Sequence, residues 1–186
     1  MIRLLQSVNV WFWRLRYPNI QRSQERGKIS SLVHILTRAP DDLAVEASAC
    51  LENMGASAAI ALVDALKHAH GAKDARAIQR ISETLFRLKG EAVESLLGVV
   101  TGTMWQTPFR YSSFGAAALD VLVDIGEPAI GPLVKMLDGG MLTPVVETAL
   151  LRIGKSVIPV LEGYPVSSTE QSRAIDKVLT RLKISH

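Results

Sequence analysis

The chain contains a single cysteine, Cys50, among its 186 residues. No internal disulfide is possible, and a catalytic thiol would need a neighbouring base that the residues around Cys50 do not supply. Cys50 lies between an alanine and a leucine in a helical pattern, where cysteine commonly behaves as a small buried apolar residue. A chain without disulfides is typical of a reducing compartment, and we expect a cytoplasmic protein.

Long apolar runs are also absent. No segment reaches the roughly 18–20 apolar residues that a transmembrane helix requires. Near the N-terminus, Gln6, Ser7 and Asn9 interrupt any apolar region of a signal peptide, and no small-residue cleavage site follows Trp13. The sequence therefore predicts neither a spanning helix nor a secretory leader.

Charge is low and unevenly placed. The net charge is +3, and residues 1–30 carry six basic residues against one acid, so the rest of the chain is slightly acidic. Binding to DNA would require clustered arginine and lysine on the binding face to neutralise phosphates. The distribution argues against a nucleic-acid partner for the body of the chain.

What the sequence does contain is a repeat. Two series of leucines recur, and their shared internal spacings are 34, 37 and 28 residues. Such agreement indicates a pair of helices repeated along the chain, which is the signature of a stacked helical solenoid. The first series is Leu51, Leu85, Leu122, Leu150 and Leu179, and the second is Leu32, Leu62, Leu96, Leu133 and Leu161.

Each repeat is expected to consist of two antiparallel helices, A and B, joined at a glycine. The clearest copy has helix A at 113–125, and Gly126 is expected to adopt a left-handed conformation at its C-terminal end. The other helices are predicted at 28–37, 41–54, 57–69, 74–88, 91–101, 144–153, 156–163 and 169–183, with turn glycines at Gly55, Gly90 and Gly154. We therefore predict an all-α fold, an α–α superhelix of about five helix pairs with atypical first and last pairs, covering residues 17–186.

The segment GAAALDVLVDIGEPAIGPLVKML (Gly115–Leu137) resembles the HEAT-like repeat of the phycobilisome-lyase type. The segment YPNIQRSQERGKISSLVHIL (Tyr17–Leu36) is similar to the way such proteins begin. The resemblance covers residues 28–183 and rests on core and turn residues. It implies a superhelix used mostly as a binding scaffold, although some relatives are lyases and a structurally related group are DNA glycosylases. No catalytic residue can be transferred from it.

The connection at 102–112 is long for a turn between helices and rich in aromatic residues. Insertions between solenoid repeats often contact ligands. The loop is a candidate partner-binding site, and the alternative is that it folds back to fill a gap in the core. The residues concerned are Trp105, Phe109, Arg110 and Tyr111.

Residues 1–16 form a basic amphipathic helix in the sequence pattern, with Phe12 and Leu15 on its apolar stripe and Trp13 off it. This helix either covers the end of the first repeat or docks on another protein or an anionic membrane surface. The candidate docking residues are Trp11, Trp13, Arg14 and Arg16.

The B helices are expected to line the concave face of the superhelix. Equivalent positions place His34, Asp64 and Lys135 along one ridge and Glu94 in the neighbouring row, and this concave surface is a candidate binding surface for a protein or peptide. His68, His70 and Asp74 do not have the spacing of a metal site, and we place them in a solvated loop.

These patterns favour a non-catalytic scaffold or adaptor that binds another protein through the concave face and the 102–112 loop. We predict no catalytic residue, metal or cofactor. The alternatives are a lyase-like or glycosylase-like enzyme built on the same superhelix, or peripheral membrane attachment through residues 1–16. The partner and the oligomeric state do not follow from the sequence.

Overall fold

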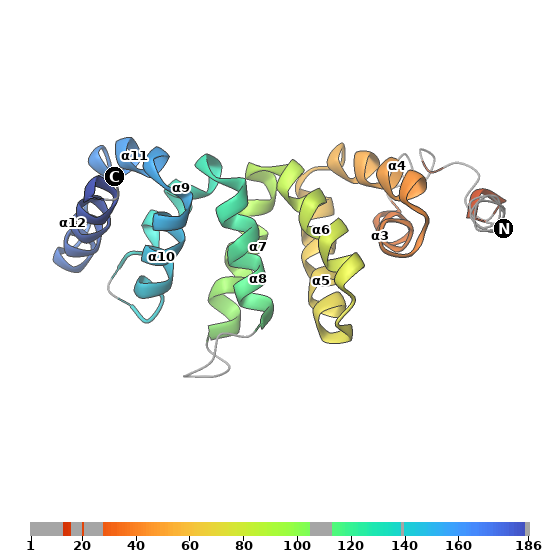
Figure 1. Ribbon diagram of the computed structural model, residues 1–186, viewed down its shortest axis with the longest axis horizontal. Helices are drawn as coiled ribbons and strands as arrows, with labels where there is room; N and C mark the ends of the chain where they lie inside the picture. The colour runs from red at the N-terminus through yellow and green to blue at the C-terminus, as the bar shows by residue number, and fades with distance from the viewer. Residues whose placement is uncertain (1–12, 16–19, 21–27, 105–112, 139, 185–186) are drawn as a thin grey trace. The chain divides into compact units, whose positions relative to one another are not determined.

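The computed structural model of the chain describes residues 13–15, 20, 28–104, 113–138 and 140–184. Every regular element among these residues is a helix, as predicted (Figure 1). The chain divides into two compact units, Met1–Ala92 (unit 1) and Val93–His186 (unit 2). No helix in the described part of the chain is long and apolar enough to cross a membrane. A separate N-terminal segment ending at residue 16 falls partly outside the described residues and stays a prediction.

The helices follow the predicted order closely. Helix α8 (Ser113–Ile125) has the bounds expected from the sequence, and most other helix ends lie within three residues of their predicted positions. Helix α7 begins in unit 1 and continues into unit 2. The remaining helices of unit 1 are α3 (Ile29–Arg38), α4 (Asp41–Glu52), α5 (Ala56–Ala72) and α6 (Ala75–Leu88). Those that follow are α7 (Gly90–Met104), α9 (Glu127–Lys135), α10 (Thr143–Ile153), the 3-10 turn η1 (Lys155–Val157), α11 (Ile158–Glu162) and α12 (Thr169–Ile184).

The repeated leucines form the core of each unit. All seven leucines that were expected to be inaccessible have an exposed fraction of 0%. Burial of one such side chain stabilises the folded state by roughly 1.5–3 kcal/mol, so the repeat signal and the main source of stability coincide. The seven are Leu51, Leu62, Leu85, Leu96, Leu122, Leu133 and Leu150.

The closest helix pairs in unit 1 differ from the predicted pairing. Helix α3 packs most extensively on α4, and α5 on α6, which lie side by side in Figure 1. The prediction had joined helices across the glycine turns, as α4 with α5. The chain reverses at Pro40, which cannot extend a helix, and at Lys73, which adopts a left-handed conformation. These two connections, and not the glycine turns, therefore join the helices that pack most extensively on one another.

The turn glycines have the positive φ angles that the sequence predicted. Gly55, Gly126 and Gly154 have φ of 59°, 74° and 90°. Their ψ angles of −136°, −124° and −151° are not those of the left-handed helical cap that we expected. Each glycine instead directly precedes the next helix, in a conformation that side chains with a Cβ rarely adopt.

Lys89 occupies the corresponding position at the turn between α6 and α7. Its φ of 50° and ψ of −125° match the glycine turns, although it carries a side chain. The prediction had assigned this turn to Gly90, which is instead the first residue of α7. A residue other than glycine in such a region costs of order 1–3 kcal/mol. The α6–α7 turn therefore stores backbone strain.

Replacing Lys89 by glycine should stabilise the protein by about 1 kcal/mol, since relief of strain exceeds the added entropy of a glycine in the unfolded chain. Urea unfolding of the full chain measures this change. The control is Lys89→Ala, which removes the charge but keeps the Cβ and should give no stabilisation. Equal stabilisation by both substitutions would show that the side chain, and not the backbone, is responsible.

Candidate functional site

An open groove runs between α3 and α5 in unit 1 and reaches the first turn of α6. Its volume is about 610 Å³. Alanines of α5 contribute much of its lining, and polar or charged side chains stand along it. The lining residues are Ser30, Val33, His34, Thr37, Arg38, Ala61, Asp64, Ala65, His68, Ala69, Ala72, Asp74 and Ala77. Small side chains on one wall leave room for another chain to approach the α5 backbone.

Two of the four residues predicted for the concave surface, His34 and Asp64, line this groove together. His68, which we expected in a solvated loop, is an exposed residue of α5, which ends at Ala72. Its Nδ1 lies 2.8 Å from the carbonyl oxygen of Asp64 and 3.7 Å from the Asp64 carboxylate. The side of the groove formed by α5 therefore carries a carboxylate and an imidazole ring.

At one end of the groove, an ion pair joins the end of α3 to the start of α6. The guanidinium of Arg38 lies 3.3 Å from the carboxylate of Asp74. The same carboxylate accepts a hydrogen bond of 3.1 Å from the backbone N–H of Ala77, which makes Asp74 the N-cap of α6. Asp74 is therefore already satisfied at two positions, and it is not part of the loop that the sequence suggested.

The N-terminal residues that the structure describes contact α3 and α4 of the same unit. The ring centroids of Trp13 and His34 are 5.7 Å apart with an interplanar angle of 37°, and Arg14 forms a 3.0 Å ion pair with Glu46 of α4. Leu15, expected on the apolar stripe, is 60% exposed, whereas Trp13, expected off it, is half-buried. The indole of Trp13 thus lies against the ring of His34 on α3, while Leu15 of the apolar stripe faces solvent. Trp11 and Arg16 lie outside the described residues.

The remaining predicted site residues are not brought into this groove by any described contact. Glu94 and Lys135 are exposed on α7 and α9, so the ridge beyond unit 1 stays a prediction. Helix α7 continues to Met104, so the first residues of the predicted 102–112 loop are helical. The aromatic part of that loop lies outside the described residues, including Trp105, Phe109, Arg110 and Tyr111.

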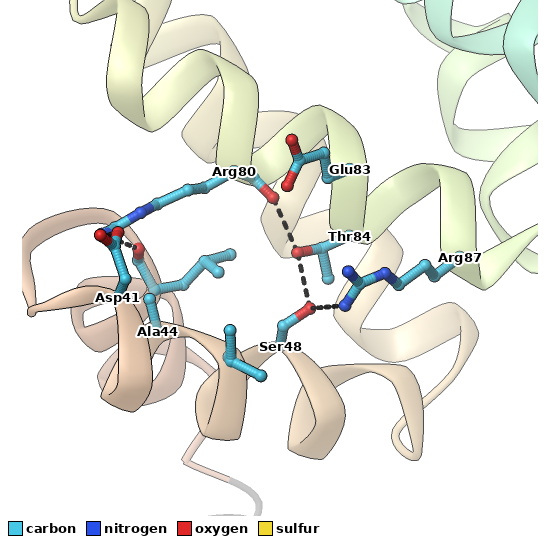
Figure 2. A pocket seen from close by; sticks show the side chains of 9 residues that line it. Asp41, Ala44, Ser48, Arg80, Glu83, Thr84 and Arg87 are labelled. Carbon is cyan, nitrogen blue, oxygen red and sulfur yellow. Dashed lines mark hydrogen bonds and ion pairs between the residues drawn. The ribbon is translucent and has the colours of Figure 1, made fainter.

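A second, smaller pocket lies between α4 and α6 (Figure 2). Its volume is about 110 Å³. The hydroxyl of Thr84 donates to the carbonyl oxygen of Arg80 at 2.8 Å and lies 3.0 Å from Ser48 Oγ, to which Arg87 also donates. Ser48 has one hydroxyl hydrogen, which it donates to Glu52 Oε1 at 2.9 Å. The polar groups of this network bond to one another and connect α4 to α6. The pocket is therefore better described as a contact between two helices than as a binding site.

Arg80 is the buried cation of this region. Its side chain is 10% exposed, and Nη1 donates to the carbonyl oxygens of Leu36 and Ala39 at 2.9 and 2.8 Å. Nη2 pairs with the carboxylate of Asp41. This role of Arg80 was not predicted from the sequence. The separation of Asp41 from Arg76 and Arg80 is close to one repeat, and that spacing was the available signal.

Asp41 forms ion pairs with both Arg76 and Arg80, and these pairs lower the pKa of its carboxyl. Hydrogen bonds from Arg76 and then Arg80 lower the pKa of Asp41 to about 2. The unfolded chain would titrate this carboxyl near pH 3.9. A lowered folded-state pKa means that the stabilisation is complete above about pH 4 and is lost as the pH falls towards 2.

The substitution Asp41→Asn should therefore destabilise the protein at pH 5 and have progressively less effect as the pH approaches 2, where the wild-type carboxyl is itself becoming protonated. Urea unfolding of both proteins at pH 5, 3.5 and 2.5 measures the difference. A difference in unfolding free energy that is independent of pH would contradict the assigned ion pairs.

Other reactive groups give no second site. Burial raises the pKa of the Cys50 thiol, with a smaller contribution from the charge of Glu46, so the reactive thiolate is disfavoured. In the described part of the chain, no three His, Cys, Asp or Glu side chains are arranged to hold a metal ion. No family model, curated protein or solved structure matches this chain.

Proposed function

We propose that this chain is a HEAT-like helical repeat protein whose repeats resemble those of the phycobilisome-lyase type. We propose further that it acts as a scaffold that binds another protein. In this proposal the helices stack into an α–α superhelix and the B helices line its concave face. Nine of the ten repeated leucines are buried, with Leu179 partly exposed, and this burial and the three positive-φ glycines at equivalent positions support the repeat assignment.

One observation carries the functional part of the proposal. An open groove lies between two successive B helices, α3 and α5, where the repeat pattern placed the binding ridge. It is open, bordered by small side chains, and flanked by polar groups, which is the form of a surface that receives a helix or peptide.

The enzymatic alternatives require a pocket with a perturbed carboxylate or tyrosine. Among the described residues, the carboxyl with a clearly shifted pKa is Asp41, which is exposed and held by two arginines. Its shift is explained by the ion pairs that join α4 to α6. The observations therefore favour binding over catalysis.

Site-specific photocrosslinking from position 61, inside the groove, tests the proposal on the full chain. We expect a discrete protein partner to be captured there and not from position 180 on α12. The purified partner should then bind Ala65→Leu, whose larger side chain fills the groove, at least about tenfold more weakly than wild type. Thr180→Leu on the exposed face of α12 is the matched control and should bind normally. Equal binding by both variants would exclude the groove as the docking site.

A further inference from the structure

We propose that the α3–α5 groove binds a basic helical segment of its partner, with a lysine or arginine of that segment placed against Asp64. This inference rests on the proposed scaffold function and names the chemical class of the partner. It is carried by the charges, the side-chain sizes and the exposed apolar surface along α5.

The charges along the groove are two carboxylates and one guanidinium. The guanidinium of Arg38 is engaged by Asp74 at 3.3 Å, and Asp74 also caps α6. Asp64 has no equivalent neighbour: within the described residues its carboxylate lies within ion-pair distance of His68 alone, at 3.7 Å, and that ring is charged only when protonated. The Asp64 side chain is 71% exposed. The charge still available to a partner is therefore negative.

The shape of α5 suits a helix as the occupant. Ala61, Ala65, Ala69 and Ala72 follow one another at spacings of four, four and three residues, so they share one face of α5 and line the groove. A stripe of small residues allows close approach of a second helix, whose own side chains then reach the polar walls. In helix-in-groove recognition, an amphipathic helix lays its apolar face into the groove, which leaves its polar side chains free to reach the charged groups along the walls.

An exposed isoleucine adds apolar surface beside the charge. Ile60 is 66% exposed and precedes Asp64 by one helical turn. A partner helix with an apolar residue one turn from a lysine or arginine would cover Ile60 and pair with Asp64 together. A partner with a carboxylate at that place would instead face Asp64 with a like charge, which is unfavourable.

Two alanine-based helical peptides of about 16 residues, long enough to form a helix, provide the test. They are identical except that one carries lysines at i, i+4 spacing and the other glutamates. Titrations against the full chain at low salt should show the lysine peptide binding at least about tenfold more tightly. The substitution Asp64→Asn, which keeps the side-chain shape, should weaken lysine-peptide binding about five- to tenfold and reduce the discrimination.

The matched control is Asp176→Asn, on the exposed face of α12, which should leave both affinities unchanged. Thermal melting of each variant shows that it is folded. If both peptides bind equally and both are weakened by Ala65→Leu, the groove is a docking site but the basic partner is excluded. If Ala65→Leu affects neither peptide, the groove is not a docking site and the proposed function fails with it. If the lysine peptide does not bind saturably, the inference is overturned.

Discussion

Replacing Arg80 by alanine is expected to destabilise unit 1 by about 2–4 kcal/mol. The side chain is nearly buried and supplies hydrogen bonds to the carbonyl oxygens of Leu36 and Ala39, where α3 ends and the chain turns into α4. Removing a charged donor from buried or half-buried acceptors costs roughly 1–3 kcal/mol for each group left unsatisfied. The same substitution removes one of the two cations that hold Asp41.

Arg76 is the matched control for this prediction, because it binds the same carboxylate from an exposed position. Its guanidinium lies 2.8 Å from Asp41, and its side chain is 60% exposed. Exposed ion pairs contribute about 0–1 kcal/mol, so Arg76→Ala should have a small effect. Equilibrium urea unfolding of both variants measures the contrast. If both substitutions cost the same, the two carbonyl contacts of Arg80 contribute nothing to stability.

Truncating Leu62 to alanine is expected to destabilise the protein by about 2–5 kcal/mol. Leu62 has an exposed fraction of 0% at the centre of α5. The loss combines the transfer free energy of the removed atoms with a cavity that the surrounding helices fill only in part. Because α5 packs on both α3 and α6, we expect the transition of the whole of unit 1 to move to lower urea concentration.

Ile60 provides the comparison on the same helix. It is a similar side chain two residues earlier, but it is 66% exposed, so Ile60→Ala should change the unfolding free energy by less than about 1 kcal/mol. Circular dichroism during urea unfolding measures both variants. Comparable losses at the two positions would mean that the packing register of α5 is incorrect.

The helical content, the core and the turn positions were predictable from the sequence. The leucine series predicted burial correctly at Leu51, Leu85 and Leu122, because a helix returns a side chain to the same face at a fixed period. The cap of α12 is equally local, since Ser168 Oγ accepts a hydrogen bond from the backbone N–H of Gln171 at 3.0 Å. These features depend on residues a few positions apart, so the sequence contains the information directly.

The residues that line the candidate site, the α3–α5 groove, were only partly predictable from the sequence. The repeat pattern assigned His34 and Asp64 to one ridge, and both line the groove between α3 and α5. The contribution of His68 was missed because we grouped it with His70 and Asp74 in a loop, although the predicted helix at 57–69 already contained it and α5 includes it.

The helical class, the burial of most repeated leucines and the positive φ of Gly55, Gly126 and Gly154 could be derived from the sequence. The tertiary structure decided which helices pair most closely, that Arg80 is buried on two carbonyl groups, and that Lys89 takes the conformation found at the glycine turns. The physical reason is distance along the chain. Helix periodicity acts over three or four residues, whereas Arg80 meets Leu36 from 44 positions away, and such a contact exists only once the helices have packed.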